Sequence, residues 1–149
     1  MFPLDPANRQ IIEILQRDGR RSFTAIAREV GISEAAVRAR VHRLTSEGVL
    51  SVVAVTDPLR LGFRRQAMVG VRTEGDIRSV ADTLAGIPEI DYVVFTSGSF
   101  DLLFEIVCED DERLLALLND KVRSIPGVRS TETFVYLKLH KQTYAWGTR

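Results

Sequence analysis

Residues 31–50 read GISEAAVRARVHRLTSEGVL, and this stretch decides how the N-terminal third of the chain folds. Val37, Val41 and Leu44 recur at helical spacing and form one narrow apolar seam. Ser33 before the seam is a good N-cap, and Gly48 after it is a natural stop. The remaining positions are mostly small or cationic. We therefore predict a helix that packs along one thin stripe and exposes its other side.

Two further helices precede this one. Asp5-Pro6 indicates a helix start, because Asp is a favourable N-cap and Pro suits the first helical position, and this helix ends near Asp18-Gly19. Ser22 caps a second, shorter helix, and Gly31 supplies the turn into the third. Two helices joined through a short glycine-containing turn are typical of a helix-turn-helix.

The apolar pattern changes after this motif. Residues 49–56 alternate loosely as a strand, and Asp57-Pro58 and Leu61-Gly62 mark a linker. Farther on, the spacing predicts the order β-α-β-β-α-β, with strands over 67–73, 92–97, 102–108 and 133–139 and helices over 77–87 and 112–125. We predict an α+β protein: a winged helix-turn-helix domain over residues 1–50, a strand and linker over 51–64, and a ferredoxin-like βαββαβ sandwich over 65–149.

The composition is that of a folded protein that lies outside membranes. Hydrophobic residues make up 45% of the chain, which is too many for a disordered protein, and no apolar run approaches the ~18 residues of a membrane span. The first residues lack the features of a signal peptide, so we expect a cytoplasmic protein. Neither the single cysteine, Cys108, nor the two histidines show metal-site spacing, so no metal or cofactor is expected.

The formal net charge is zero, which argues against a uniform polyanion binder. Residues 1–50 nevertheless carry eight arginines against six acids. This weak excess permits, but does not by itself indicate, a nucleic-acid role for the N-terminal part.

The chain resembles the Lrp/AsnC, or feast/famine, family of transcription regulators. The resemblance covers nearly the whole chain and runs through VGIS at 30–33, EGV at 47–49, GSFD at 98–101 and IPGV at 125–128. One departure is Asn8, where the family usually has a second Asp, and it weakens an expected ion pair. The resemblance implies an N-terminal domain that binds DNA and a C-terminal domain that pairs subunits and binds a small effector, commonly an amino acid. It also implies a dimer, in some members assembled into tetramers, octamers or larger rings.

The outward side of the third helix is the candidate DNA-reading surface. Small residues let a helix enter the major groove, about 12 Å wide, and an arginine can hold guanine bidentately at ~1–3 kcal/mol per good pair. Ser22 and Thr24 can donate to a phosphate, although simple capping explains Ser22 better. Arg40 flanks the seam, and pairing with an acid of a neighbouring helix is an equally good interpretation. The candidate DNA-binding residues are Ser22, Thr24, Ser33, Glu34, Ala35, Arg38, Ala39, His42 and Arg43.

The loop over residues 96–101, TSGSFD, is the candidate effector site. Backbone amides around Gly98 can receive a carboxylate and Asp101 can meet an ammonium group, and the resemblance places the effector near this loop at a subunit interface. A plain hairpin turn is the alternative. Two threonines of the last strand can add hydroxyl contacts, although β-propensity explains them equally well. The candidate effector-binding residues are Gly98, Ser99, Phe100, Asp101, Thr131 and Thr133.

Together these features predict a homo-oligomeric, sequence-specific transcriptional regulator that binds double-stranded DNA and is modulated by an amino acid or a related metabolite. Two alternatives stay open. One is an architectural, nucleoid-type DNA-binding protein without an effector. The other, which we disfavour, is an enzyme, since some relatives of this architecture resemble tetrapyrrole decarboxylases. The only histidine of the second domain is His140, and no nucleophile–base pair or phosphate-binding loop is present, so we expect no catalytic residues.

Overall fold

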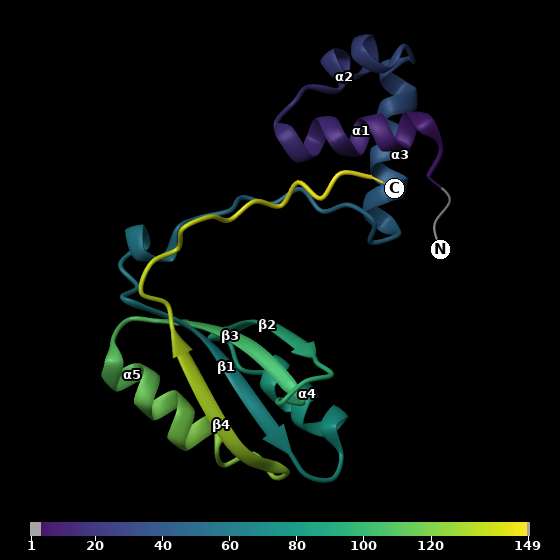
Figure 1. Cartoon of the computed structure of the whole chain (residues 1–149). Helices are drawn as coiled ribbons and strands as arrows, with labels where there is room; N and C mark the ends of the chain where they lie inside the picture. The colour runs from purple at the N-terminus through teal and green to yellow at the C-terminus, as the bar shows by residue number, and fades with distance from the viewer. Residues whose placement is uncertain (1–3, 149) are drawn as a thin grey trace. The chain divides into compact units, whose positions relative to one another are not determined.

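The computed structural model describes residues 4–148, which form two compact units (Figure 1). The first unit contains the residues up to Val55 together with those from Lys141 onward, and the second runs from Thr56 to His140. Within residues 4–148, no helix is both long and apolar enough to cross a membrane.

Three helices build the first unit: α1 (Pro6–Arg17), α2 (Phe23–Val30) and α3 (Glu34–Ser46). Each begins at the cap that the sequence predicts. Asp5, Ser22 and Ser33 accept the backbone N–H three residues on, at 2.7, 3.2 and 3.2 Å. Gly31 ends α2 in the left-handed conformation (φ 78°), which a residue with a Cβ adopts at a cost. The predicted helix-turn-helix is confirmed.

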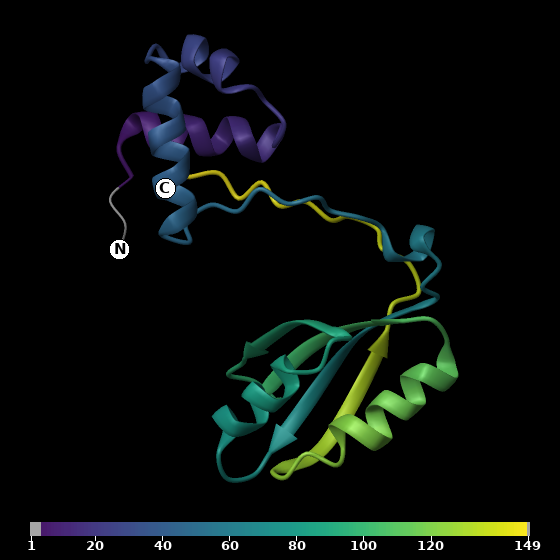
Figure 2. The ribbon, with the colours of Figure 1, turned by 180° about the vertical axis from the view of Figure 1, so that it is seen from behind.

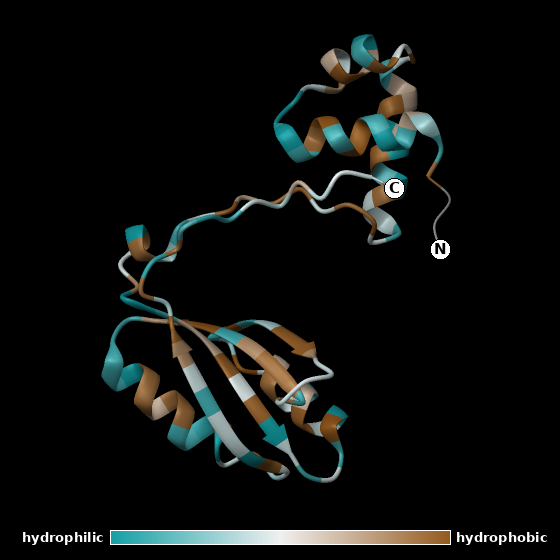
Figure 3. Ribbon diagram, in the orientation of Figure 1, coloured by the Kyte–Doolittle hydropathy of each residue, from teal (hydrophilic) through white to brown (hydrophobic). Residues whose placement is uncertain are grey.

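The core of this unit is small and comes from all three helices. Ile11 of α1, Ile26 of α2, and Val37 and Leu44 of α3 are fully buried. Hydrophobic and hydrophilic residues alternate along each helix in Figure 3, as expected for helices with one buried side. α3 therefore contributes only a narrow stripe to the core.

The second unit is a sandwich of one sheet and two helical segments. Its elements follow the order β1 (Arg65–Thr73), α4 (Ile77–Ala85), β2 (Ile90–Phe95), β3 (Leu102–Cys108), α5 (Asp111–Ala116) and β4 (Val128–Val135), and α5 continues into the π-helical turn η2 (Leu117–Val122). The strands pair antiparallel in the order β2-β3-β1-β4. Figure 2 shows the sheet and these helices from behind. The ferredoxin-like βαββαβ fold is confirmed.

The two faces of the sheet differ sharply. Residues of β3 are alternately buried and half-buried, with Leu102, Phe104, Ile106 and Cys108 packed in the core with α4, α5 and η2. The opposite face, here called the open face, is not covered by either helix. On the open face the Phe100 ring lies against Gly70, where an added Cβ would fall 2.6 Å from the ring.

Three features differ from the sequence prediction. The strand expected within residues 51–64 is not formed: residues 50–57 have no regular structure, and Pro58–Leu61 is a 3-10 turn (η1). A strand needs a hydrogen-bonded partner, and within the described chain residues 51–56 make no backbone hydrogen bond to another segment. β4 begins at Val128 rather than at residue 133, because Val128 already pairs with Thr73 of β1.

The third difference concerns the C-terminal tail, which was expected to belong to the second domain. Residues from Lys141 onward group with the first unit. There the Gly147 N–H donates to Gln16 Oε1 (3.2 Å) and the Thr148 hydroxyl donates to Glu13 Oε1 (2.6 Å), both on α1. These long-range contacts leave no local pattern in the sequence.

The contact between Gly70 and Phe100 generates a prediction. Gly70→Ala places a methyl group inside van der Waals distance of the Phe100 ring, so we expect the free energy of unfolding to fall by about 1–3 kcal/mol. Gly98→Ala is the matched control, because its Cβ would meet nothing within 4 Å. Denaturant unfolding of both variants measures the difference. Equal stability of the two variants would contradict the packing of Phe100 on Gly70.

Candidate DNA-reading helix and effector loop

The predicted reading face of α3 is exposed throughout. Val37 and Leu44 are fully buried on one side of the helix. The predicted contacts on the other side are solvent-exposed, namely Glu34, Ala35, Arg38, Ala39, His42 and Arg43. The fold therefore leaves exposed the surface that the sequence assigned to DNA.

Arg38 is held within a small polar cluster on this face. Its Nη2 donates to Glu34 Oε1 (2.9 Å), one helical turn away, and its Cζ lies 5.1 Å from the centre of the Phe23 ring. Glu34 Oε2 accepts the hydroxyl of Thr24 on α2 (2.7 Å). The Thr24 hydrogen bond, and then that of Arg38, hold the pKa of Glu34 below its ordinary value. Glu34 is therefore ionised at neutral pH.

The candidate DNA-binding residues at the helix starts already make contacts within the protein. Ser22 and Ser33 accept backbone N–H groups as caps, so their hydroxyl protons stay available to an anion. Thr24 instead donates its hydroxyl proton to Glu34, although it lies on the exposed surface. Its structural role is to connect α2 to α3, which the sequence interpretation missed because Glu34 lies ten residues away.

Arg40 has the structural role that the sequence left open. Its Nη1 donates to Asp5 Oδ2 (2.6 Å) and to Asn8 Oδ1 (2.9 Å), so it ties α3 to the first turn of α1. The Asn8 side chain thus still accepts from Arg40, although it carries no charge. The Asn8 backbone N–H, and then Arg40, hold the pKa of Asp5 below its ordinary value.

The candidate effector loop is tightly organised by its own contacts. Asp101 Oδ2 accepts both the backbone N–H and the hydroxyl of Thr73, at 2.7 and 3.1 Å, so this carboxylate secures the end of β1. Phe100 makes an edge contact with Phe134 (centroids 6.0 Å apart) and lies under the Arg72 guanidinium. Gly98 and Ser99 are exposed. Within one chain, the accessible part of the loop is thus residues 97–99, which include Gly98 and Ser99.

The sheet separates the predicted effector residues. Thr131 and Thr133 of β4 pair with Val71 and Val69 of β1, which point into the core, so both threonines face the helical side. Thr131 Oγ1 accepts from Arg123 Nε (3.2 Å). Phe100 lies on the open face instead. Within one chain the structure does not bring the two threonines to the loop.

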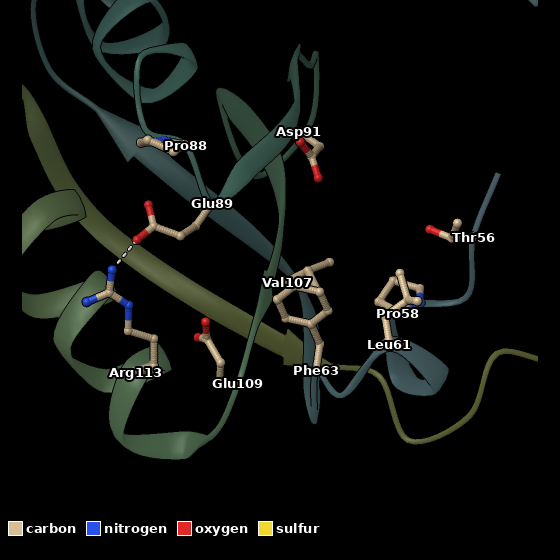
Figure 4. A pocket seen from close by; sticks show the side chains of 10 residues that line it. All are labelled: Thr56, Pro58, Leu61, Phe63, Pro88, Glu89, Asp91, Val107, Glu109 and Arg113. Carbon is tan, nitrogen blue, oxygen red and sulfur yellow. Dashed lines mark hydrogen bonds and ion pairs between the residues drawn. The ribbon is translucent and has the colours of Figure 1, made fainter. Parts of the chain in front are cut away.

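A hollow of about 270 Å³ lies at the ends of β2 and β3 that are opposite the loop over residues 96–101 (Figure 4). Glu89 accepts from Arg113 and, at 3.0 and 3.1 Å, from Lys121. Lys121, ahead of Arg113, lowers the pKa of Glu89. No sequence pattern described above predicts this hollow. It is lined by Thr56, Pro58, Leu61, Phe63, Pro88, Glu89, Asp91, Val107, Glu109 and Arg113, none of them a predicted effector residue.

Family models match both parts of the chain. The AsnC-type helix-turn-helix domain matches residues 4–45, and an AsnC-type C-terminal dimeric alpha+beta barrel domain matches residues 63–149. The transcriptional regulator FL11 of Pyrococcus horikoshii is 37% identical, over 95% of this chain and 94% of that protein. The proline dehydrogenase transcriptional activator of Rhizobium radiobacter is 30% identical, over 94% and 93%.

Solved structures share the fold over nearly the whole chain. The leucine response regulatory protein LrpA of Mycobacterium tuberculosis superposes with a TM-score of 0.85 at 25% identity, covering 93% of this chain and 96% of that one. A transcriptional regulator of Neisseria meningitidis, solved as an L-Met complex, superposes with a TM-score of 0.84 at 22% identity, covering 96% of each chain.

Replacing Arg40 of α3 should destabilise the protein more than replacing Arg38 of the same helix. Arg40→Ala removes the link from α3 to Asp5 and Asn8, so we expect the melting temperature to fall by a few degrees at neutral pH. Arg38→Ala removes an exposed pair and should leave it nearly unchanged. Thermal unfolding monitored by circular dichroism measures both. A larger loss in Arg38→Ala would reverse the two roles.

The Arg40 contribution should also depend on pH. A carboxylate whose folded pKa is depressed stabilises the protein above its unfolded pKa, and this stabilisation disappears as the pH falls through the folded value. The pKa of Asp5 is lowered in the fold. The difference between wild type and Arg40→Ala should therefore be full at pH 7 and shrink below about pH 4, near the ordinary pKa of Asp.

Proposed function

The chain belongs to the Lrp/AsnC family of transcriptional regulators, and we propose that it binds specific inverted DNA sites as a dimer whose affinity an amino acid or related metabolite modulates. The family and the relatives named above are regulators, which confirms the prediction that the chain is not an enzyme. The sequence specificity, the effector and the assembly state are the proposed part.

The exposure of α3 is the observation that supports DNA reading most directly. A helix enters the major groove when its outer side is free and its backbone can approach the base edges. Ala35 and Ala39 provide the close approach, and Arg38 and His42 provide donors on the same exposed side. The hydroxyl protons of Ser22 and Ser33, whose oxygens cap their helices, are suited to contacts with phosphates, which fix the register of the helix.

The open face of the sheet is the surface we propose for pairing two subunits. It displays apolar side chains, including Tyr92 (50% exposed) and Phe134 (45% exposed). Its polar residues form hydrogen bonds with one another, and Gln66 donates to Glu105 (2.9 Å). Burial, followed by the hydrogen bond to Glu105, raises the pKa of Tyr136 to about 12. A match to a C-terminal domain described as dimeric supports the same assignment.

A twofold dimer fixes the form of the DNA site. It presents two copies of α3, so the half-sites should be inverted and about one helical turn (~34 Å), or a multiple of it, apart. An effector changes the DNA affinity only through a difference in its affinity for two states of the assembly.

Two considerations support an amino-acid effector. A structural neighbour with the same fold was solved as an L-Met complex. The loop of this chain presents exposed Gly98 and Ser99, whose backbone groups suit a carboxylate. Because Asp101 is already bonded to Thr73, a second subunit is the better source of a partner for the ammonium group.

Charge reversal on α3 tests the DNA assignment. We expect Arg38→Glu to lower the affinity for the selected site at least about a hundredfold, since it loses a base contact and adds repulsion from phosphates. Arg78→Glu on α4 is the matched control, with the same charge change in the second unit. Mobility-shift titration measures the affinities.

Footprinting of the wild type should show one protected inverted site; uniform periodic protection would favour an architectural protein instead.

A ligand screen tests the effector assignment separately. A hundredfold excess over Kd stabilises a protein by ~2.7 kcal/mol, so thermal-shift measurements with the twenty amino acids should identify the ligand. The D-enantiomer of each positive amino acid is the control for specific recognition. If no amino acid raises the melting temperature, the effector proposal fails while the DNA assignment stands.

A further inference from the structure

An acidic side chain sits in the middle of the proposed DNA-reading surface. Glu34 is exposed at the start of α3 and is the only carboxylate among the candidate DNA contacts. A carboxylate near phosphates lowers affinity through repulsion. Its presence on this face therefore needs an explanation.

Stability supplies only part of that explanation: the helix dipole favours an acid in the first turn of α3, and the Thr24 hydrogen bond links α2 to α3. The Glu34–Arg38 pair is an exposed i,i+4 pair, with 46% and 64% of the two side chains accessible. Exposed pairs of this kind contribute little to folding, because water screens them and two long side chains lose freedom. Ser33 already caps the helix by accepting the Ala36 N–H, so Glu34 is not needed as the N-cap.

The contacts of Glu34 instead fix the position of Arg38. Each carboxylate oxygen has one donor: Oε2 accepts Thr24 from α2 and Oε1 accepts Arg38 from α3. Thr24 and Phe23 both belong to α2. Thr24 holds the Glu34 carboxylate, and the Phe23 ring supports the Arg38 guanidinium, whose Cζ lies 5.1 Å from the ring centre. Arg38 is thus restrained on two sides, although it is largely exposed.

We propose that Glu34 is a positioning residue that gives the protein specificity by restraining and neutralising Arg38. This inference rests on the proposed function, in which α3 reads the major groove. On a wrong sequence, Arg38 gains a phosphate only by leaving Glu34, so it adds little to non-specific binding. On the correct site, its remaining N–H donors meet the base edge while Nη2 stays on Glu34.

The Glu34 carboxylate is unfavourable near phosphates, and this repulsion raises specificity. Its experimental signature is a change in the salt dependence of DNA affinity. Each phosphate that a cation neutralises adds about 0.9 to the slope of log affinity against log salt. Glu34→Gln removes the negative charge but keeps an oxygen that can accept from Thr24. Arg38 is then free to pair with a phosphate on any sequence.

The experiment compares a selected and a scrambled duplex. Wild-type protein first selects its site from a random duplex pool; fluorescence anisotropy then gives Kd on that site and on a scrambled duplex over a range of KCl concentrations. For Glu34→Gln we expect binding to the scrambled duplex to tighten about three- to tenfold, and its salt slope to steepen by about 0.9 per half-site. The ratio of the two affinities should fall about tenfold.

Glu47→Gln is the matched control for the loss of one negative charge. Glu47 lies at the other end of the same helix, is exposed, and its side chain has no partner among residues 4–148. It should leave both the affinity ratio and the slope unchanged. An equal effect of Glu47→Gln would mean that general charge, not the contact with Arg38, is responsible, and would overturn the inference.

A double-mutant cycle tests whether Glu34 acts through Arg38. In an Arg38→Ala background, Glu34→Gln should no longer change the affinity ratio or the slope. A full effect in that background would overturn the inference, because Glu34 would then contact DNA directly. If the wild type selects no site at all, the proposed function fails; if it selects a site that requires Arg38 but Glu34→Gln keeps the wild-type ratio, only this inference fails.

Discussion

The attachment of α3 to its domain by one narrow seam is the constraint on which the proposed activity depends. Val37 and Leu44 are fully buried, and Arg40 adds a polar link to the first turn of α1. Residues two apart on a helix point about 200° away from each other. Arg40 can therefore hold the helix while Arg38, on the other side, stays exposed. A wider seam would stabilise the domain further but would cover the reading surface.

The parts of the fold that follow local rules were predictable from the sequence. Asp5, Ser22 and Ser33 each cap a helix with a side chain three residues from the N–H it accepts, so a short window contains all the information. The order of elements in the sandwich follows from apolar spacing. The exposed side of α3 was predictable for the same reason, since helical spacing fixes which positions share a side.

The parts that depend on distant partners were not predictable. Alternation places Thr131 and Thr133 on one face of β4, but only the pairing with β1 decides that this face is the helical one. Asp101 appeared free to bind an ammonium group until the structure brought Thr73 to it, from 28 positions away. The strand expected within residues 51–64 has a suitable pattern, but no strand partner among residues 4–148. The periodicity of the sequence predicts which residues share a face and where a helix begins or ends. Contacts between distant segments decide what each face packs against.

The effector loop and the proposed pairing surface share a residue, and this has a mechanical consequence. Phe100 belongs to the loop, yet its ring lies on the open face against Gly70 and Phe134. A ligand bound at Gly98 and Ser99 cannot move Phe100 without changing the surface that we propose meets the second subunit. If both proposals hold, ligand binding and subunit pairing are coupled within one domain, as a shift between two packings of the same face.

The charge of the chain shows why restraint of a single arginine can matter. Twenty cationic and twenty acidic residues give a formal net charge of zero, so the protein lacks the general attraction to DNA that a basic protein has. A regulator must find its site among about 10⁶–10⁹ competing ones, so the ratio of specific to non-specific affinity counts for more than affinity alone. A dimer applies each half-site's contribution twice, and a factor of about three in one half-site becomes about ten for two, since free energies add. A neutral chain and a neutralised arginine therefore act in the same direction: both weaken binding to wrong sequences, and neither takes a base contact away from the right one.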